Sequence, residues 1–298
     1  MNLRDLRYLV ALADARHFGR AAENSHVSQP TLSAQIRKLE EQLGVQLIER
    51  QPRKVALTAV GERVVALARR VLHEVSDITE LAREARDPLS GTLRVALIPT
   101  LGPYLLPIVM PRIRKLLPRL QLLLYEFQTA PLLERLRAGE LDLGVLALGV
   151  DVAGLEVEPL YEEPFVLAAP GTHALAKKAQ VRAEDLSGET LLLLEDGHCL
   201  RDQALEVCSR VDVHEAGDFR GTSLETLRQM VAAGLGVTLL PELATEGPFA
   251  AAKNLALRPF AKPAPRRTLA AVWRKSSSRG PAVRAVAGAI REALAARR

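Results

Sequence analysis

Two cysteines, Cys199 and Cys208, are the residues whose type and spacing point most directly to chemistry, and they are the only cysteines of this 298-residue chain. His198 precedes Cys199, and Arg201 follows it by two positions. Cationic neighbours lower the pKa of a thiol, and the thiolate is its reactive form. Residues 200–207 are good helix formers without Gly or Pro, so we expect Cys199 at a helix N-terminus, which also favours an anion.

The spacing of the two cysteines determines whether they could form a disulfide while this helix is intact. Nine residues of helix correspond to roughly 13 Å of rise and about half a turn of phase, so the two thiols would face apart. A disulfide needs its Cα atoms within about 7 Å of each other. Oxidation to a disulfide would therefore require this segment to unfold.

Two other interpretations of the cysteines are open at this point. Cysteine often serves as a small buried hydrophobe without a reactive role. A zinc site could draw on His198, Cys199, Cys208 and His214, but the short ligand pairs of structural zinc sites are absent. The rest of the chain has to decide among these possibilities.

The composition limits the class of protein. With 48% hydrophobic and 25% charged residues, the chain is typical of globular proteins, and its length predicts two or three domains. It has no secretory signal and no apolar run long enough to cross a bilayer, so we expect a cytoplasmic protein without a membrane partner. A persistent disulfide is unusual in the cytoplasm, whereas a transient one carries information. A net charge of +5 favours an anionic partner.

Residues 1–58 have the pattern of a winged helix-turn-helix domain. An apolar stripe at helical spacing covers residues 3–13, and a short second helix is expected from Phe18. The third helix follows Ser28, a natural N-cap, with Pro30 in its first turn. Two helices joined by a tight turn place the second helix in the DNA major groove. Residues 47–57 read as a β-ribbon wing with a basic tip that can reach phosphates. The alternative to a DNA-binding domain is a small helical domain that packs against another protein.

A long helix and a domain boundary come next. Thr58 is expected to cap a helix from Ala59 to about Arg86, in which apolar residues recur every three and four positions. Such a stripe predicts a coiled-coil linker and a dimer. The segment Asp87–Gly91 should end the helix. We therefore expect a DNA-binding domain over 1–58, a linker helix over 59–87 and an effector domain over 88–298.

The effector domain alternates strands and helices, which predicts an α/β fold with a parallel sheet. Helices are expected at about 104–117, 131–138 and 282–298, with a capped helix from Ser223. Strands are expected at 93–98, 120–127, 141–148, 165–169, 190–194, 237–240 and 269–272. Ligands of such sheets bind at the carboxyl ends of the strands. Thr100, Thr129 and Cys199 each lie just after an expected strand, which makes them a candidate site.

Several segments resemble the LysR-type transcriptional regulators. They are Phe18–Ala22 and Ser28–Ser33 in the first domain, and 97–100, 102–107, 194–203 and 222–227 in the effector domain. The last four are most similar to the hydrogen-peroxide sensors of that family, and the resemblance runs through nearly the whole chain. It implies a two-lobed effector domain similar to periplasmic binding proteins, with lobe I at about 91–162 plus 267–298 and lobe II at about 163–266.

For the sensor site, the resemblance implies that Cys199 is the peroxidatic thiolate, which gives a sulfenic acid, and that Cys208 resolves it to a disulfide. Residues that match those holding the peroxide or supporting the thiolate are Thr100, Thr129, His198, Arg201, Asp202 and Arg266. No metal and no cofactor are expected.

The resemblance also implies the partners of the chain. They are double-stranded promoter DNA, hydrogen peroxide as the signal, further copies of the chain in a homodimer and homotetramer, RNA polymerase, and the glutaredoxin or thioredoxin system as reductant. Positions that match DNA-binding ones are Ser28, Gln29, Pro30, Thr31, Ser33, Gln35, Lys38, Arg50, Arg53 and Lys54. Disulfide formation would rearrange the effector domain and so change promoter binding and activation.

Two alternatives compete with a peroxide-sensing regulator. One is a regulator of the same architecture that binds a small organic effector between its lobes, with incidental cysteines. The other is an enzyme, either a thiol peroxidase or a Cys/His hydrolase. Against the enzyme, the chain has no Cys-x-x-Cys motif, and spacing identifies no third group for a Cys-His triad.

Overall fold

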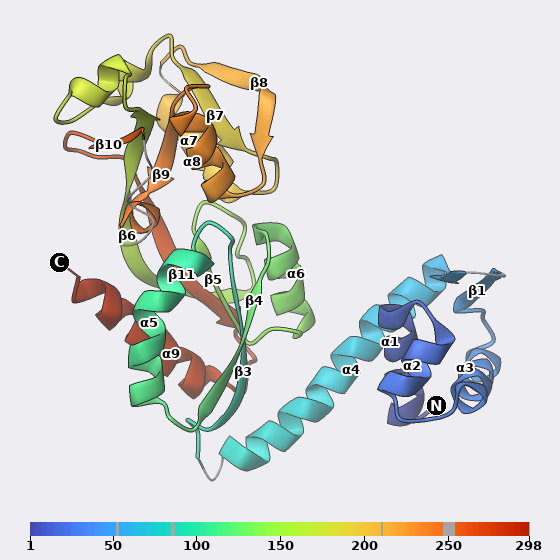
Figure 1. Cartoon of the computed structure of the whole chain (residues 1–298). Coiled ribbons are helices and arrows are strands. Elements are labelled where there is room, and N and C mark those ends of the chain that lie inside the picture. Colours follow the sequence, from blue (N-terminus) through green and yellow to red (C-terminus); the bar gives the residue numbers. More distant parts are fainter. Residues whose placement is uncertain (52–53, 85–86, 210, 247–253, 298) are drawn as a thin grey trace. The chain divides into compact units, whose positions relative to one another are not determined.

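The computed structural model describes residues 1–51, 54–84, 87–209, 211–246 and 254–297 (Figure 1). The chain divides into two compact units. One is Met1–Arg86 together with Ala138–Glu140, and the other is Asp87–Arg137 with Leu141–Arg298. No described helix combines the length and apolarity needed to cross a membrane.

Three helices form the core of the first unit: α1 (Leu3–Ala15), α2 (Phe18–Asn24) and α3 (Gln29–Leu43). As predicted, Ser28 caps α3, because its hydroxyl accepts a hydrogen bond from the Thr31 amide at 3.3 Å, and proline occupies the first turn. The inward stripe of α3 is fully buried among apolar side chains of the other helices; it consists of Leu32, Ile36 and Leu39. The polar residues between them are left facing outward.

An antiparallel ribbon, β1 (Ile48–Gln51) and β2 (Lys54–Leu57), forms the expected wing. The Glu40 carboxylate of α3 accepts from the amides of Leu47 at 2.8 Å and Ile48 at 3.1 Å, which ties the ribbon to the recognition helix. The long helix α4 (Ala59–Glu84) follows, and the hydroxyl of its predicted cap, Thr58, accepts from the Gly61 amide at 2.9 Å. Over residues 59–78, its exposed large apolar side chains are Val60, Leu67, Val71 and Ile78.

A seven-stranded sheet organises the second unit, in the order β10-β6-β11-β5-β3-β4 with β9 also pairing with β6. The strands are β3 (Gly91–Leu97), β4 (Leu120–Glu126), β5 (Leu143–Ala147), β6 (Leu155–Pro170), β9 (Thr238–Pro241), β10 (Leu255–Pro259) and β11 (Arg266–Arg274). Only β3 pairs in parallel, with β4 and β5; the other pairs are antiparallel.

The prediction of a parallel sheet was therefore wrong for four of these seven strands, β6, β9, β10 and β11, which form only antiparallel pairs. The chain passes to the distal part of the unit in β6 and returns in β11, so these two long neighbours must run in opposite directions (Figure 1). The sequence-based lobe limits, 162/163 and 266/267, fall inside these two strands. The two predicted lobes are therefore connected by β6 and β11, each of which continues from one lobe into the other.

A second, parallel pair, β7 (Thr190–Leu194) and β8 (His214–Gly221), lies in the distal part and is joined by α7 (Cys199–Cys208). Helix α8 (Leu224–Ala232) follows β8, with the expected Ser223 cap. The sequence HEAGDFRG of β8 has little strand propensity, so this strand was not predicted, and β10 was missed as well. The described residues of this part also form the short 3₁₀ helices η1 (Ala174–Lys177), η2 (Ala183–Leu186) and η3 (Glu242–Thr245).

The sheet is covered by α5 (Gly102–Leu116), α6 (Thr129–Ala138) and α9 (Gly280–Ala295). In Figure 1, α5 and α9 lie side by side. The apolar side chains of these helices, of the sheet and of α7 and α8 belong to one continuous core. Burial of that core fixes the strand ends from which the loops carrying Thr100, Gln128 and His198 project.

Candidate functional site

Both cysteines lie on α7, one at each end. Cys199 is its first residue and Cys208 its last, and both are free thiols that are buried, at 8% and 2% exposure. Nine steps of helix separate them by about 13 Å along the axis. The predicted helix is thus confirmed, and it holds the sulfurs too far apart to bond.

A tight turn sets the start of α7. Gly197 has φ +94°, a conformation that glycine adopts without a steric penalty. A Cβ atom at this position would lie 2.8 Å from Oε1 of Gln128. Gln128 follows β4, and its Nε2 lies 3.2 Å from Nε2 of His198, the N-cap residue of α7. Glycine therefore lets the Gln128 amide approach this turn closely enough to hold the imidazole.

Burial sets the protonation of two groups around the helix. It lowers the pKa of His198 from 6.5, with Glu195 acting weakly in the opposite direction, so the imidazole is neutral near pH 7. It raises the pKa of the Cys208 thiol from its ordinary value of 9.0. Cys208 is thus kept as an unreactive thiol while α7 is intact.

A pocket of about 420 Å³ opens beside Cys199. Its lining brings together three predicted site residues, Cys199, Asp202 and Arg266. The other lining residues are Leu148, Gly149, Val150, Phe165, Gln203, Glu206, Val207, Pro265, Arg267 and Thr268. Gln203 donates to the Leu148 carbonyl at 3.1 Å, which links α7 to the loop after β5. The pocket therefore combines one buried thiol with charges of both signs.

The two predicted threonines are both buried, in different states of hydrogen bonding. Thr100 lies just after β3, and its Oγ1 accepts from Nη1 of Arg267 at 3.1 Å. Thr129 is the first residue of α6, and its Oγ1 has no hydrogen-bond partner in the described part of the chain. Because a buried polar atom without a partner is costly, the Thr129 hydroxyl is suited to a small polar ligand.

Arg267, like Gln128, is a site residue that sequence reasoning missed. Its predicted neighbour Arg266 is exposed and lines the pocket, whereas Arg267 is buried at 3% exposure. Nε of Arg267 lies 2.8 Å from Oε2 of Glu163, and Oε1 of Glu163 accepts from the Leu243 amide at 2.9 Å. Strand alternation along Arg266–Leu269 could have revealed this, since Arg267 shares its face with buried Leu269.

Arg201 and Asp202 point to different surroundings. The guanidinium of Arg201 contacts the carboxylates of Asp196, at 3.0 Å, and Glu215. Arg201 therefore ties α7 to the preceding turn and to β8, and most of its charge is matched there. Asp202 is exposed on the pocket lining. Within the described residues no group of three or more His, Cys, Asp or Glu side chains is placed to hold a metal ion.

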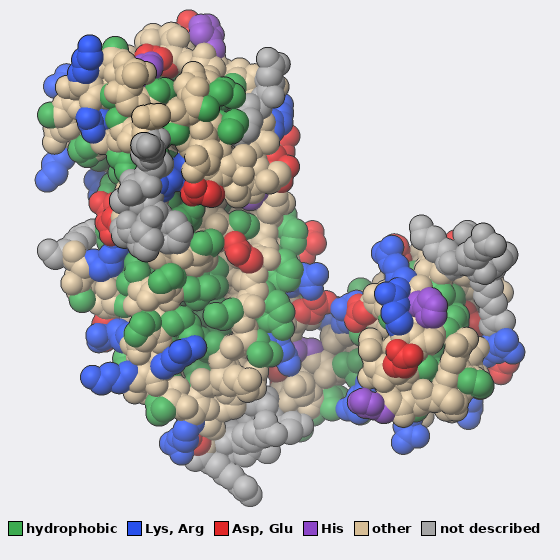
Figure 2. Space-filling model, in the orientation of Figure 1, with side chains coloured by type: hydrophobic (Ala, Val, Ile, Leu, Met, Phe, Trp, Pro, Cys, Tyr) green, Lys and Arg blue, Asp and Glu red, His purple; other side chains and the backbone are tan. Residues whose placement is uncertain are grey.

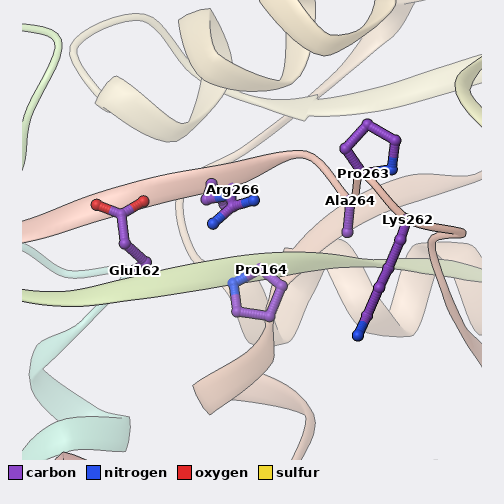
Figure 3. A pocket seen from close by; sticks show the side chains of 6 residues that line it. All are labelled: Glu162, Pro164, Lys262, Pro263, Ala264 and Arg266. Carbon is purple, nitrogen blue, oxygen red and sulfur yellow. The ribbon is translucent and has the colours of Figure 1, made fainter.

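A second pocket, of about 690 Å³, also borders Arg266 (Figure 3). It is lined by Glu162, Pro164, Lys262, Pro263, Ala264 and Arg266. Glu162 already accepts a hydrogen bond from the Thr268 hydroxyl at 2.6 Å. Of the charged residues of this pocket, Glu162 lies on β6, Lys262 lies in the segment before β11, and Arg266 is the first residue of β11. None of these side chains is buried.

The predicted DNA-contacting residues of the first unit lie at the start and along the outer side of α3. Those at least partly exposed are Ser28, Gln29, Pro30, Thr31, Ser33, Gln35 and Lys38. Arg50 and Lys54 belong to the wing strands β1 and β2, while Arg53 lies outside the described residues. Figure 2 shows Lys and Arg side chains distributed over the visible face of this unit.

Family models match both units. Residues 3–62 match the bacterial regulatory helix-turn-helix protein model of the LysR family, and residues 86–295 match the LysR substrate binding domain. The chain belongs to the LysR family. The prediction from the sequence motifs is thereby confirmed, together with a fold of helix-turn-helix, linker helix and α/β effector domain.

Relatives of known function share about half of the sequence. The chain is 50% identical over 277 residues to the DNA-binding transcriptional dual regulator OxyR of Escherichia coli K12, covering 93% of this chain and 90% of that protein. It is 49% identical over 293 residues to the hydrogen peroxide-inducible genes activator of Dickeya chrysanthemi, covering 98% and 95%. The chain is an OxyR-like transcriptional regulator and not an enzyme.

Solved structures agree with this assignment. Full-length OxyR C199D from Pseudomonas aeruginosa is 43% identical and covers 98% of this chain and 95% of its own, with a TM-score of 0.77. The oxidised form of OxyR is 44% identical with a TM-score of 0.65, covering 71% of this chain and 99% of its own. The reduced form of OxyR is 43% identical with a TM-score of 0.64, covering 70% of this chain and 98% of its own.

Proposed function

We propose that this LysR-family chain senses hydrogen peroxide through Cys199 and regulates transcription by a disulfide with Cys208. One observation carries the proposal: the only two cysteines lie buried and unbonded at opposite ends of a single helix, one of them in a polar pocket. The relative from Dickeya chrysanthemi, named hydrogen peroxide-inducible genes activator, supports the choice of signal.

The chemistry takes two balanced steps. The Cys199 thiolate attacks one oxygen of hydrogen peroxide; the S–O bond forms, the O–O bond breaks, and hydroxide leaves to give a sulfenic acid. The Cys208 thiolate then attacks the Cys199 sulfur, the S–S bond forms, and the second oxygen leaves as water. The two thiols lose two electrons, and peroxide is reduced to two molecules of water.

The predicted site residues, of which Cys199, Asp202 and Arg266 line the pocket, have distinct tasks in the first step. The Thr129 hydroxyl has no partner among the described residues, so it is free to bond a peroxide oxygen. Neutral His198, held by Gln128, can accept the proton that Cys199 releases on forming its thiolate and pass it to the leaving hydroxide, which becomes water. Arg266 lines the pocket together with Cys199 and supplies a positive charge to it. Arg201 fixes the position of α7 through Asp196 and Glu215, and Asp202 lines the pocket.

The second step requires α7 to unfold. Cα atoms of a disulfide lie within about 7 Å, and an intact helix separates these residues by about 13 Å. Because α7 connects β7 to β8, its unfolding alters the link between the two strands. Oxidation is thereby converted into a rearrangement of the effector domain.

The output is promoter binding by residues 1–58, through the α3 surface and the wing. The exposed apolar residues of α4 recur at Val60, Leu67, Val71 and Ile78, spacings of seven, four and seven that suit a coiled coil between two copies. We assign 59–87 as the dimerising linker and 88–298 as the effector domain. Two dimers forming a tetramer, contact with RNA polymerase, and reduction by glutaredoxin or thioredoxin in the cytoplasm complete the proposal.

One experiment tests the function. Purified reduced protein is treated with hydrogen peroxide, its free thiols are counted, and its footprint on promoter DNA is compared before and after. Loss of both thiols with an altered footprint is the expected result. Continued peroxide consumption with added reductant and an unaltered footprint would indicate a peroxidase. Unchanged thiols would indicate a regulator that responds to a small organic effector.

A further inference from the structure

Strands β6 and β11 form an antiparallel ribbon that has a different pocket on each face. Phe165 of β6 and Arg267 of β11 line the pocket beside Cys199. Glu162 and Pro164 of β6 line the second pocket instead, the one of about 690 Å³ (Figure 3). Side chains alternate between the two faces of a strand, so this second pocket lies on the opposite face of the ribbon.

From this second pocket, which we call the outer pocket, we propose that the chain binds a small organic anion at a site separate from the peroxide pocket. The ligand class is a molecule that carries a carboxylate or phosphate group on a short apolar body. Neither cysteine lines the outer pocket, so the proposal goes beyond peroxide sensing and does not depend on it.

The outer pocket contains two cations that are available to a ligand, Lys262 and Arg266. Neither side chain forms an ion pair or hydrogen bond within the described part of the chain. The residue opposite Arg266 on β6 is Pro164, whose ring offers no acceptor. Charges of one sign in a concave site raise the local concentration of ions of the other sign, so the pocket attracts anions.

The carboxylate of the outer pocket, Glu162, leaves these cations unneutralised. Its Oε1 accepts a hydrogen bond from the hydroxyl of Thr268, its partner across the ribbon, at 2.6 Å. Glu162 forms no ion pair with Lys262 or Arg266 in the described structure. Two positive charges and one negative charge leave the lining with a net charge of +1, which suits an anion better than a cation.

The remaining lining of the outer pocket is apolar and consists of Pro164, Pro263 and Ala264. In Figure 3, Arg266 and Pro164 lie between Glu162 on one side and Lys262 on the other. Pockets of several hundred Å³ with apolar walls and a few polar groups are typical of small-molecule sites. The anionic group is therefore expected near Lys262 and Arg266, with the apolar body against the proline rings.

The test is equilibrium dialysis of the reduced, full-length chain against phenyl phosphate, benzoate and inorganic phosphate. We expect saturable binding of about one phenyl phosphate or benzoate per chain, with a millimolar Kd that rises with added salt. Comparing these two probes distinguishes phosphate from carboxylate as the preferred group. Inorganic phosphate lacks the apolar body and should bind more weakly. If neither aromatic probe bound saturably, the proposal would be overturned.

Two substitutions inside the outer pocket should act in opposite directions. Lys262→Gln removes an exposed cation and should raise the Kd of phenyl phosphate roughly threefold. Glu162→Gln removes a charge of the same sign as the ligand and should lower the Kd by a similar factor. General damage to the fold cannot tighten binding, so a higher Kd in Glu162→Gln would contradict an anion site here.

Two matched controls locate the site. Lys275→Gln makes the same charge change just beyond the other end of β11 and should leave the Kd unaltered; a loss equal to that of Lys262→Gln would indicate a general charge effect and overturn the proposal. Asp202→Asn removes a carboxylate from the peroxide pocket instead. Tighter binding in Asp202→Asn, but not in Glu162→Gln, would place the anion in the peroxide pocket and also overturn it.

The anion site and the proposed peroxide sensing fail separately. Cys199→Ser cannot form a sulfenic acid, yet it should bind phenyl phosphate with the Kd of the parent. Weaker binding in this variant would mean that the probe occupies the peroxide pocket, against the proposal. A parent chain that binds the probe in a Lys262-dependent way but keeps both thiols in peroxide would retain the anion site and lose the sensing function.

Discussion

The amide of Gln128 and the imidazole of His198 are joined at 3.2 Å between their Nε2 atoms, across 70 residues of sequence. Gln128 directly precedes α6, and His198 directly precedes α7, so this contact aligns the starts of two helices. It also occupies the Nε2 atom of the imidazole. The contact is the basis of the first prediction.

Replacing Gln128 by Leu should slow oxidation of Cys199 by roughly fivefold, the effect of one neutral hydrogen bond, because His198 loses the partner that orients it. Probe-detected sulfenic acid in the Cys208→Ser background measures the rate. Gln121→Leu is a matched control on exposed β4 and should leave the rate unchanged. Equal rates for the two variants would show that the Gln128–His198 contact has no part in the reaction.

Gly197→Ala should destabilise the reduced protein and also slow its oxidation. The left-handed φ costs an alanine about 1–2 kcal/mol, and its Cβ would displace the Gln128 amide. Gly188→Ala separates the two effects, since Gly188 has φ +79° but open space where a Cβ would lie. Urea unfolding should show a lower free energy of unfolding for both variants, whereas slower oxidation of Cys199 should be confined to Gly197→Ala. Slow oxidation in both would point to strain alone.

The reduced protein should lose stability at both ends of the pH range. Burial lowers the pKa of His198 from 6.5, so the stability it contributes is present above that value and is lost as pH falls through the lower, folded pKa. Burial raises the pKa of Cys208 from 9.0, so its contribution is present below that value and is lost as pH rises through the higher, folded pKa. Urea unfolding under reductant from pH 5 to pH 10 measures both limbs.

Single substitutions identify which residue causes the loss of stability at acid pH and which causes the loss at alkaline pH. His198→Asn should flatten the acid limb and leave the alkaline one, and Cys208→Ser should do the reverse. Persistence of the alkaline limb in Cys208→Ser would mean that other groups, not this buried thiol, cause it.

Weakening α7 should speed disulfide formation without changing the first step. Glu206 lies on an exposed face of the helix, and glycine costs about 1 kcal/mol relative to alanine in a helix interior. Glu206→Gly should therefore convert sulfenic acid to disulfide roughly fivefold faster than Glu206→Ala. Both variants lose the same charge, so the comparison isolates backbone preference. The conversion is monitored by quenching samples at intervals and counting their free thiols. Equal conversion rates for the two variants would mean that helix opening does not limit the step.

Lys54→Gln on the wing should weaken binding to promoter and unrelated DNA alike, and should reduce the slope of log affinity against log salt by about one. A phosphate contact carries no sequence information, so the preference for the promoter should persist. Titrations at several salt concentrations provide the measurement. Lys115→Gln on α5 is the charge-matched control, and an equal change in its slope would argue against a wing contact.

The sequence was sufficient to predict the elements whose signals are local. The Ser28 cap, the Thr58 cap and the uninterrupted helix formers after Cys199 each depend on a few neighbouring residues, and the structure contains all three. Cys199 and Thr100 were also identified correctly as lying beyond strand ends, because buried strands are evident as apolar runs.

Contacts across the sheet could not be predicted in the same way. Choosing between Arg266 and Arg267 requires the register and facing of β11, and the partner of Arg267, Glu163, lies 104 residues away. The Gln128–His198 contact likewise joins two loops that only the packed core brings together. Strand β8 was missed because its pairing with β7, rather than the propensity of its own residues, makes it a strand.

Placing the two sulfurs at the ends of one folded helix has a consequence for timing. Under the proposed mechanism, a sulfenic acid formed at Cys199 must wait for a ten-residue segment to open before it can be locked as a disulfide. During that delay a passing reductant can erase the signal. A brief pulse of oxidant would then leave no record, while a sustained one would be stored in a covalent bond, so the helix acts as a filter on duration.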